Sequence, residues 1–304
     1  MENTKISIIG ANSYIARNVV IQLKEFGIDN INLYDMQDKS LDSNDKYKQV
    51  NILSKESLNE VDFDCDILYI FTGKTGTIQG FDDYDSYIDI NEKGLLNIID
   101  TYRNKNSKAK IIFPSTRLLY KGQKDVKLKE DDEKEFKTLY AINKYSCEQY
   151  LKMYNNSYGI NYSVFRICVP YGTLIPGASS YGTAEFFLSK AKKGEDITIY
   201  GDGSQKRTLI HMKDLCNALI KGALNSECVN DVYNIGGAND MSLYEMASAI
   251  GKIYNVGVKF IEWPESSLKV ESGDTIFDSA KFDRKNKFIY NQNFNKWIKE
   301  EQNI

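Results

Sequence analysis

Length, composition and charge describe an ordinary globular protein and exclude several classes of function. The 304 residues, 42% hydrophobic and 27% charged, can bury a sizeable core. The net charge of −3 gives no broad attraction to nucleic acid or to anionic membranes. No apolar run approaches the roughly 18 residues of a membrane-spanning helix, and the N-terminal MENTKISIIG has no signal-peptide pattern. We expect a cytoplasmic protein without nucleic-acid or membrane partners.

The cysteines and the histidine argue against disulfide bonds and against a metal site. The five cysteines are scattered and never form a C-x-x-C spacing, so we expect free thiols with structural roles. His211 is the only histidine, and without a histidine cluster or a cysteine pair we expect no metal. We interpret His211 as a packed structural residue, because a hydrolase triad would depend on it alone.

The first half of the chain alternates strand-like and helical segments. Strand-like runs cover residues 5–9, 31–34, 66–71, 110–113 and 162–166. Apolar residues at helical spacing predict helices over residues 13–26, 84–103 and 138–158. This alternation implies right-handed crossovers between parallel strands. The predicted fold class is therefore α/β, with a Rossmann-like doubly wound parallel sheet.

The turn after the first strand has features of a dinucleotide-binding turn. Gly10 ends the strand-like run, where the chain must turn tightly, and Ser13 and Ala16 take the places of the other two glycines of G-x-G-x-x-G. Both are small enough for close approach of a pyrophosphate, which the N–H groups and dipole of a helix N-terminus attract. An ordinary strand–turn–helix is the alternative.

Asp35 favours NAD as the cofactor. It ends the second strand-like run, INLYD, where a carboxylate can bind both hydroxyls of the adenosine ribose. The 2′-phosphate of NADP would lie beside it, and two unit charges at about 4 Å repel by roughly 4 kcal/mol at an effective dielectric near 20. A solvated aspartate at a strand end is the alternative.

Tyr140 and Lys144 form a candidate proton-transfer pair. They are separated by one helical turn on the helix predicted over 138–158, so both can point into one cleft. A neighbouring ammonium favours the phenolate form of tyrosine, which can then act as general base or acid. Thr116 lies upstream in PSTRLLY, directly after the strand-like run 110–113, where it would reach the ligand-binding edge of the sheet.

Together these motifs resemble the extended short-chain dehydrogenases, and among them the NAD-dependent nucleotide-sugar epimerases and dehydratases. The resemblance extends over nearly the whole chain and includes FTG at 71–73, IYGDGSQKRTLIHMKDLCNAL at 199–219 and YNIGG at 233–237. It implies that the catalytic residues are Thr116, Tyr140 and Lys144. The residues that it implies for cofactor binding are Gly10, Ser13, Tyr14, Ile15, Asp35, Asn51, Ile52, Phe71, Thr72, Gly73, Asn91, Tyr140 and Lys144. Those implied for substrate binding are Lys74, Thr116, Tyr200 and Arg207, the last as the arginine that holds the substrate diphosphate.

Three positions depart from the family pattern. Val169 replaces the usual asparagine in RICVPYG, which puts one hydrogen bond to substrate or cofactor in doubt. Glu271 stands where many relatives carry an arginine, so it removes one phosphate contact and adds a negative charge. Arg117 and Leu118 follow Thr116 where the 4,6-dehydratases carry Asp-Glu, so elimination of water would lack its acid/base pair.

The resemblance implies two lobes and a reaction at a sugar hydroxyl. We expect an NAD-binding domain over 1–165, to which 207–238 returns, and a smaller C-terminal substrate-binding lobe formed by 166–206 and 239–304. The expected activity is epimerisation of a nucleotide-diphosphate sugar, with C4 as the expected position: Tyr140 takes the hydroxyl proton, hydride passes to NAD, and the keto sugar is reduced on its other face. A 4-dehydrogenase, a 4-ketoreductase and a non-catalytic NAD-binding regulatory protein are the alternatives. We also expect a homodimer.

Overall fold

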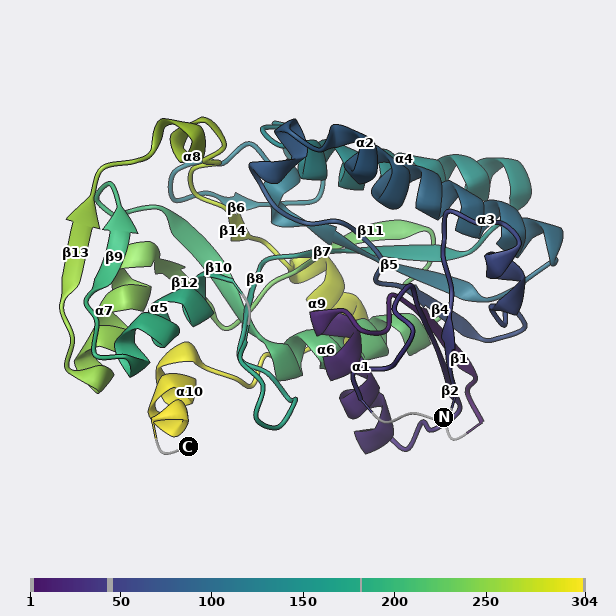
Figure 1. The fold of residues 1–304 in the computed structure, drawn as a ribbon, viewed down its shortest axis with the longest axis horizontal. Coiled ribbons are helices and arrows are strands. Elements are labelled where there is room, and N and C mark those ends of the chain that lie inside the picture. The colour runs from purple at the N-terminus through teal and green to yellow at the C-terminus, as the bar shows by residue number, and fades with distance from the viewer. Residues whose placement is uncertain (1–2, 43–45, 181, 303–304) are drawn as a thin grey trace.

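The centre of the molecule is a seven-stranded parallel sheet (Figure 1). The computed structural model describes residues 3–42, 46–180 and 182–302. The strands follow the order β11-β7-β5-β4-β1-β2-β3, in which the chain starts in the middle and reverses direction once. Their bounds are β1 Ile6–Ile9, β2 Ile31–Asp35, β3 Tyr47–Gln49, β4 Ile67–Ile70, β5 Lys110–Thr116, β7 Tyr162–Ile167 and β11 Asp231–Ile235. This is the predicted doubly wound α/β fold.

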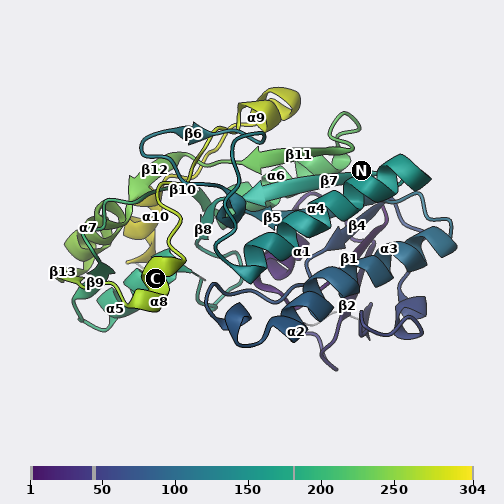
Figure 2. The same cartoon turned by 90° about the horizontal axis from the view of Figure 1, so that it is seen from above.

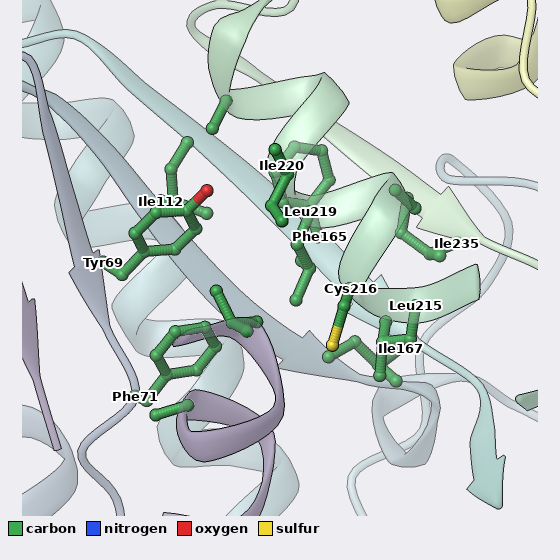
Figure 3. Packing of buried hydrophobic residues seen from close by; sticks show 14 of the residues in the cluster. Tyr69, Phe71, Ile112, Phe165, Ile167, Leu215, Cys216, Leu219, Ile220 and Ile235 are labelled. Atoms are coloured by element: carbon green, nitrogen blue, oxygen red, sulfur yellow. The ribbon is translucent and has the colours of Figure 1, made fainter. Parts of the chain in front are cut away.

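Helices cover both faces of this sheet, and buried apolar side chains fill the space between. Figure 1 shows α2, α3 and α4 along one face and α1 and α6 on the other. The bounds are α1 Tyr14–Glu25, α2 Tyr84–Tyr87, α3 Gly94–Asn104, α4 Leu139–Tyr158 and α6 Met212–Leu224. Figure 3 shows how Leu215 and Leu219 of α6 pack towards the sheet residues Phe165 and Ile167. The central strands β1 (ISII) and β4 (ILYI) are buried on both sides, and their sequences are accordingly almost continuously apolar.

Helix ends follow the capping chemistry of the sequence. Ser13 caps α1 by accepting from Ala16 N–H, and Thr138 caps α4 by accepting from Ala141 N–H at 3.1 Å. The helix predicted over 84–103 is confirmed, although a π-helical segment, Ile88–Lys93, separates its α-helical parts α2 and α3. No helix in the described ranges combines the length and the apolar character that crossing a bilayer requires.

A second lobe packs at one end of the main sheet (Figures 1 and 2). It contains the three-stranded sheet β12-β10-β8 and the parallel pair β13-β9. The strand bounds are β8 Val169–Tyr171, β9 Ile197–Tyr200, β10 Lys206–His211, β12 Asn239–Ser242 and β13 Val258–Ile261. Its helices are α5 Thr183–Lys192, α7 Leu243–Tyr254, α8 Glu265–Lys269 and α10 Phe294–Glu301. Its own apolar cluster includes Phe187, Ile250 and Trp297.

The C-terminal part of the chain also contributes to the main body. Strand β14 (Ile276–Phe277) pairs in parallel with β6 (Lys127–Leu128), which lies between β5 and α4 in sequence. Helix α9 (Ala280–Asn286) follows, and its Phe282 packs edge-on against Phe165 of β7 and Tyr233 of β11. Residues 280–286 therefore pack on the main sheet, although the sequence-based division assigns them to the second lobe.

Candidate active site

A cavity of about 650 Å³ opens at the carboxyl ends of β1, β4, β5 and β7. Its wall combines the β1–α1 turn, the segment after β4, the end of β5, the first turn of α4 and the chain from β7 into β8. In doubly wound sheets ligands bind at this edge, where the strand order reverses. Of the predicted site residues, those that line it are Ser13, Tyr14, Ile15, Phe71, Thr72, Gly73, Thr116, Tyr140 and Lys144.

Gly10 allows the first turn to approach the neighbouring strand end. Its φ is +86°, in the left-handed region, and a Cβ there would lie 2.6 Å from the carbonyl carbon of Phe71 and from the nitrogen of Thr72. Any side chain would therefore clash with backbone. The turn brings the N-terminus of α1, with Ser13 as its cap, to the cavity wall. Free N–H groups and the positive dipole end there suit a pyrophosphate.

Asp35 lies at the end of β2, outside the cavity lining, with its carboxylate turned to the same turn. Its Oδ2 accepts a hydrogen bond from Asn12 N–H at 3.0 Å. Arg17, on the first turns of α1, forms two hydrogen bonds of 2.7 Å with Asp42 in the segment after β2. This pairing occupies a cation that could otherwise receive a 2′-phosphate. Both observations favour NAD over NADP.

The segment after β4 is held by the side chain of Asn91. Its Oδ1 accepts from Lys74 N–H at 2.7 Å, and its Nδ2 donates to Lys74 O at 3.0 Å. Asn91 lies in the π-helical segment, so this local distortion places its amide against the loop. The predicted substrate residue Lys74 instead binds Asp83 and Ser86 through its ammonium. Neither Asn91 nor Lys74 lines the cavity.

Strand β5 and helix α4 bring Thr116, Tyr140 and Lys144 to one cavity. Thr116 ends β5, and its Oγ1 accepts from Leu118 N–H at 3.2 Å, which leaves the hydroxyl proton free to point elsewhere. Tyr140 stands in the first turn of α4, where the Thr138 cap fixes the start of the helix. Because Lys144 is one turn further along, it shares the helix face of Tyr140.

Lys144 is a buried cation whose environment fixes its position. Its Nζ donates to Pro114 O at 2.9 Å and lies 4.3 Å from the ring centroid of Phe113 and 6.0 Å from that of Tyr140. Burial lowers the pKa of Lys144 to about 8. At neutral pH the side chain is still mostly charged. It therefore presents a positive charge to the phenol of Tyr140, which favours the phenolate.

No carboxylate lines this cavity within the part of the chain that the structure describes. The acid nearest in sequence on α4, Glu148, lies behind the wall and is paired with Arg166. Besides Lys144, the one cation in the described lining is Arg117. The cavity thus presents positive charge and hydroxyl groups to a ligand.

Several predicted residues lie outside this lining. Asn51 and Ile52 follow β3, where the Ile52 side chain packs against Gly94 of α3. Tyr200 packs against Trp263 in the second lobe, with ring centroids 5.2 Å apart and ring planes tilted by 40°. Arg207 is only 3% exposed and pairs with Glu271. His211 packs against Tyr171 and accepts a hydrogen bond from Lys213 N–H at 3.2 Å, and burial lowers its pKa to about 4, as expected of a structural residue.

The lining also contains residues that were not assigned to the site from the sequence, three of which, Arg117, Leu118 and Val169, were named there only as departures from the family pattern. They come from the segment after β4, from the residues on either side of Thr116, from the chain running from β7 into β8, and from the start of α5. They are Thr75, Gly76, Thr77, Gln79, Pro114, Ser115, Arg117, Leu118, Ile167, Cys168, Val169, Pro170, Gly182 and Thr183. Ser115 and Arg117 could have been predicted as lining residues, because they flank Thr116 in the sequence. The residues of the segment after β4 and of the start of α5 flank no predicted catalytic residue, so the sequence does not indicate their position.

Residues 6–236 match the model of the NAD dependent epimerase/dehydratase family. The chain belongs to this family. It is thus an enzyme of the extended short-chain dehydrogenase type, and its cofactor is NAD. The matched region runs from β1 to the end of β11, so it includes every strand of the main sheet and all three predicted catalytic residues.

Relatives with assigned names show how varied this family is. The chain is 27% identical over 253 residues to a putative UDP-glucose 4-epimerase of Methanocaldococcus jannaschii, covering 81% of each chain. It is 26% identical to CDP-paratose 2-epimerase of Salmonella typhi, covering 69% of this chain and 70% of the relative. It is also 26% identical to a UDP-N-acetyl-alpha-D-glucosaminuronate decarboxylase of Bacillus cytotoxicus, covering 71% of this chain and 67% of the relative. These relatives differ in reaction, so the family alone does not define it.

Solved structures of family members share the whole fold. UDP-glucose 4-epimerase of Thermotoga maritima, solved with UDP-glucose, superposes with a TM-score of 0.85 over 98% of this chain and 97% of its own, at 20% identity. UDP-glucuronic acid 4-epimerase of Bacillus cereus, solved with UDP-glucuronic acid and NAD, has a TM-score of 0.81 over 98% of both chains, also at 20% identity. The second lobe is therefore shared as well as the sheet.

The residues of this family member fit NAD. The side-chain-free Gly10 and the N-terminus of α1 form a cradle for a pyrophosphate, and the Asp35 carboxylate stands at the end of β2 for a ribose. At the other end of the site, a Cβ at Gly73 would lie 3.7 Å from Lys144 Nζ, so the loop after β4 approaches the ammonium closely. A nicotinamide ribose placed there would meet Lys144 and Tyr140.

Proposed function

We propose that this enzyme is a nucleotide-sugar epimerase that acts at C4 of the sugar. The observation that carries the proposal is the common cavity of Thr116, Tyr140 and Lys144, which adjoins the NAD-binding turn. The cavity volume of about 650 Å³ is in the range of small-molecule sites. The absence of a carboxylate from its described lining speaks against dehydration, which needs an additional acid and base.

Each catalytic side chain has a separate task in this mechanism. Tyr140 accepts the proton of the sugar hydroxyl and later returns it, as general base and then general acid. Lys144 favours the phenolate through its charge and holds its position through Pro114 O. Thr116 orients the reacting oxygen with its hydroxyl. When bound, NAD supplies the acceptor and donor of the hydride.

Epimerisation requires that the keto sugar turn over within the site before it is reduced. The apolar wall of Leu118, Ile167 and Val169 offers few hydrogen bonds that would fix one face of the ring. Val169, where relatives carry an asparagine, thus removes one polar contact from this wall. A ring that is held mainly at its diphosphate can rotate, which supports epimerisation over one-way oxidation or reduction.

The test is turnover of a panel of nucleotide sugars in D₂O. Purified enzyme with NAD is incubated with UDP-, dTDP-, GDP- and CDP-sugars, and products are identified by ¹H NMR. A C4 epimerase gives the C4 epimer with hydrogen retained at C4 and no net reduced nicotinamide absorbance. Stoichiometric reduced nicotinamide would identify a 4-dehydrogenase, and turnover of only 4-keto sugars with added NADH a 4-ketoreductase. Conversion of no nucleotide sugar would overturn the proposal.

A further inference from the structure

Arg117 is a cation of the cavity that no carboxylate of the described chain neutralises. It directly follows Thr116 and lines the same cavity. Its Nη1 donates to two hydroxyl oxygens, Thr275 Oγ1 at 2.9 Å and Ser272 Oγ at 3.3 Å. Its Nε and Nη2 groups have no acceptor among the described residues. Two N–H-bearing nitrogens of the guanidinium therefore remain available to a ligand.

The electrostatic surroundings of Arg117 leave its charge incompletely balanced. Burial is the main cause that lowers its pKa to about 9, and the nearby charge of Arg207 acts in the same direction. Glu271 opposes this from a distance, but its carboxylate is bound to Arg207. A buried cation without a close counter-ion is costly, and an anionic ligand would relieve that cost.

Arg207 is in the opposite situation. Its Nη2 lies 2.5 Å from Glu271 Oε1, and its Nη1 donates to the carbonyl oxygens of Lys206 and Gly273. Glu271 also accepts from Gly273 N–H at 3.0 Å, which fixes the carboxylate in place. Arg207 is 3% exposed and does not line the cavity. Arg207 and Glu271 therefore form a neutral pair built into the second lobe.

We propose that Arg117 holds the diphosphate of the substrate and that Arg207 is a structural residue. This inference rests on the proposed function and replaces the role predicted for Arg207 from sequence. The two arginines are neighbours, since Thr275 forms a β-bridge with Arg207 and accepts a hydrogen bond from Arg117. Every nucleotide sugar carries a diphosphate, and a guanidinium fork matches phosphate oxygens. With Thr116 as its neighbour, Arg117 can hold the diphosphate while Thr116 holds the reacting oxygen.

The experiment measures binding of nucleoside diphosphates by calorimetry to the NAD-loaded enzyme. UDP, dTDP, CDP and GDP are compared first, and the tightest is used with all variants, together with its parent nucleoside. Arg117→Met should weaken the diphosphate by about 10- to 100-fold, the size of a charge-assisted contact, and leave the nucleoside unchanged. Arg117→Lys, which keeps the charge, should recover part of the loss. Unchanged NAD binding by each variant shows that it is folded.

Two further variants serve as matched controls. The double variant Arg207→Met/Glu271→Gln removes the neutral pair without changing the net charge, and should keep the affinity within about threefold. Lys206 precedes Arg207 in the sequence, is exposed, and pairs with Asp125 at 2.6 Å. Lys206→Met removes this cation and should leave the affinity for the diphosphate unchanged.

Each contrary result has its own meaning. Full affinity in Arg117→Met together with a large loss in the double variant would assign the diphosphate to Arg207 and overturn the inference. A loss in Arg117→Met that is confined to UDP-glucuronate, with UDP and UDP-glucose unaffected, would identify a sugar carboxylate as the anion and overturn it too. If none of the four diphosphates binds the wild-type enzyme, the proposed function falls with the inference. If the wild-type enzyme binds a nucleoside diphosphate and Arg117→Met binds it equally well, the inference is wrong but the proposed function is not contradicted.

Discussion

Both carboxylate oxygens of Glu148 accept hydrogen bonds from the guanidinium of Arg166, at 3.0 Å and 2.6 Å. Glu148 is on the catalytic helix α4 and Arg166 is on β7, and both side chains are buried. Ser115 Oγ donates to the same carboxylate at 2.5 Å. The network thus joins the strand end that carries Thr116 to the helix that carries Tyr140 and Lys144. Relative placement of the three catalytic groups depends on it.

Removal of Glu148 should destabilise the protein and disturb catalysis. Glu148→Ala leaves the Arg166 charge buried without its counter-ion, so the free energy of unfolding should fall by about 3 to 5 kcal/mol. Urea denaturation measures the loss. Asp100→Asn, which weakens the partly exposed ion pairs of Asp100 with Lys55 and Arg103, is the matched control and should cost less than about 1 kcal/mol. Equal losses of unfolding free energy in the two variants would show that the buried network stabilises the protein no more than a surface ion pair.

Tyr140→Phe should abolish most turnover and preserve the fold. The substitution keeps the ring and removes only the hydroxyl, and general acid–base catalysis contributes a factor of about 10² to 10⁴. We expect a loss of that order in kcat on the true substrate, with NAD binding unchanged by fluorescence titration. More than a tenth of the wild-type kcat would mean that another group is the base.

Lys144→Met should make the protein more stable at neutral pH while it weakens NAD binding and activity. Lys144 loses its proton near pH 8 in the folded protein, against 10.5 for an ordinary lysine. Between these values the unfolded chain holds more protons, so the stability of the wild type rises with pH. Below pH 8 the buried charge lowers the free energy of unfolding of the wild type by about 3 kcal/mol, because each pKa unit corresponds to about 1.4 kcal/mol. The gain in stability of Lys144→Met is smaller than this, because the variant also loses the hydrogen bond to Pro114 O.

The pH dependence of melting checks this assignment. The difference in melting temperature between Lys144→Met and the wild type should be largest below pH 8 and shrink as the pH approaches 10.5. Lys110→Met is a useful comparison, because burial also lowers the pKa of Lys110 to about 8 at a position outside the cavity lining. A variant less stable than the wild type at all pH values would refute the assigned cost.

Asp35→Ala should narrow the preference for NAD over NADP. The carboxylate would repel a 2′-phosphate by up to about 4 kcal/mol at 4 Å, less where water screens it. We expect NADP to bind about tenfold more tightly to the variant. Adding Asp42→Ala frees Arg17 from its ion pair and should improve NADP further. Fluorescence titration with both cofactors measures the ratio, and tighter NADP than NAD binding by the wild type would contradict the prediction.

Local signals in the sequence account for the elements that were predicted well. Ser13 and Thr138 cap their helices as the sequence pattern indicates. Strand β5 ends and helix α4 begins at the same edge of the sheet, and this brings Thr116 and Lys144 together. The π-helical segment around Asn91 was not predicted, since it depends on bonds to the Lys74 backbone. The pairing of Arg207 with Glu271 also escaped prediction, because it joins residues far apart in the chain.

The position of β11 at one edge of the main sheet has a consequence for synthesis of the protein on the ribosome. Its partner β7 ends at Ile167, but β11 begins only at Asp231, and the aromatic ring of Phe282 that covers both comes later still. A growing chain therefore leaves the edge of β7 unpaired until residues 231–235 of its 304 have been made. Unpaired strand edges of this kind promote aggregation and delay folding. The edge of the main sheet that lies away from the Asp35 strand is thus the last to be paired during synthesis.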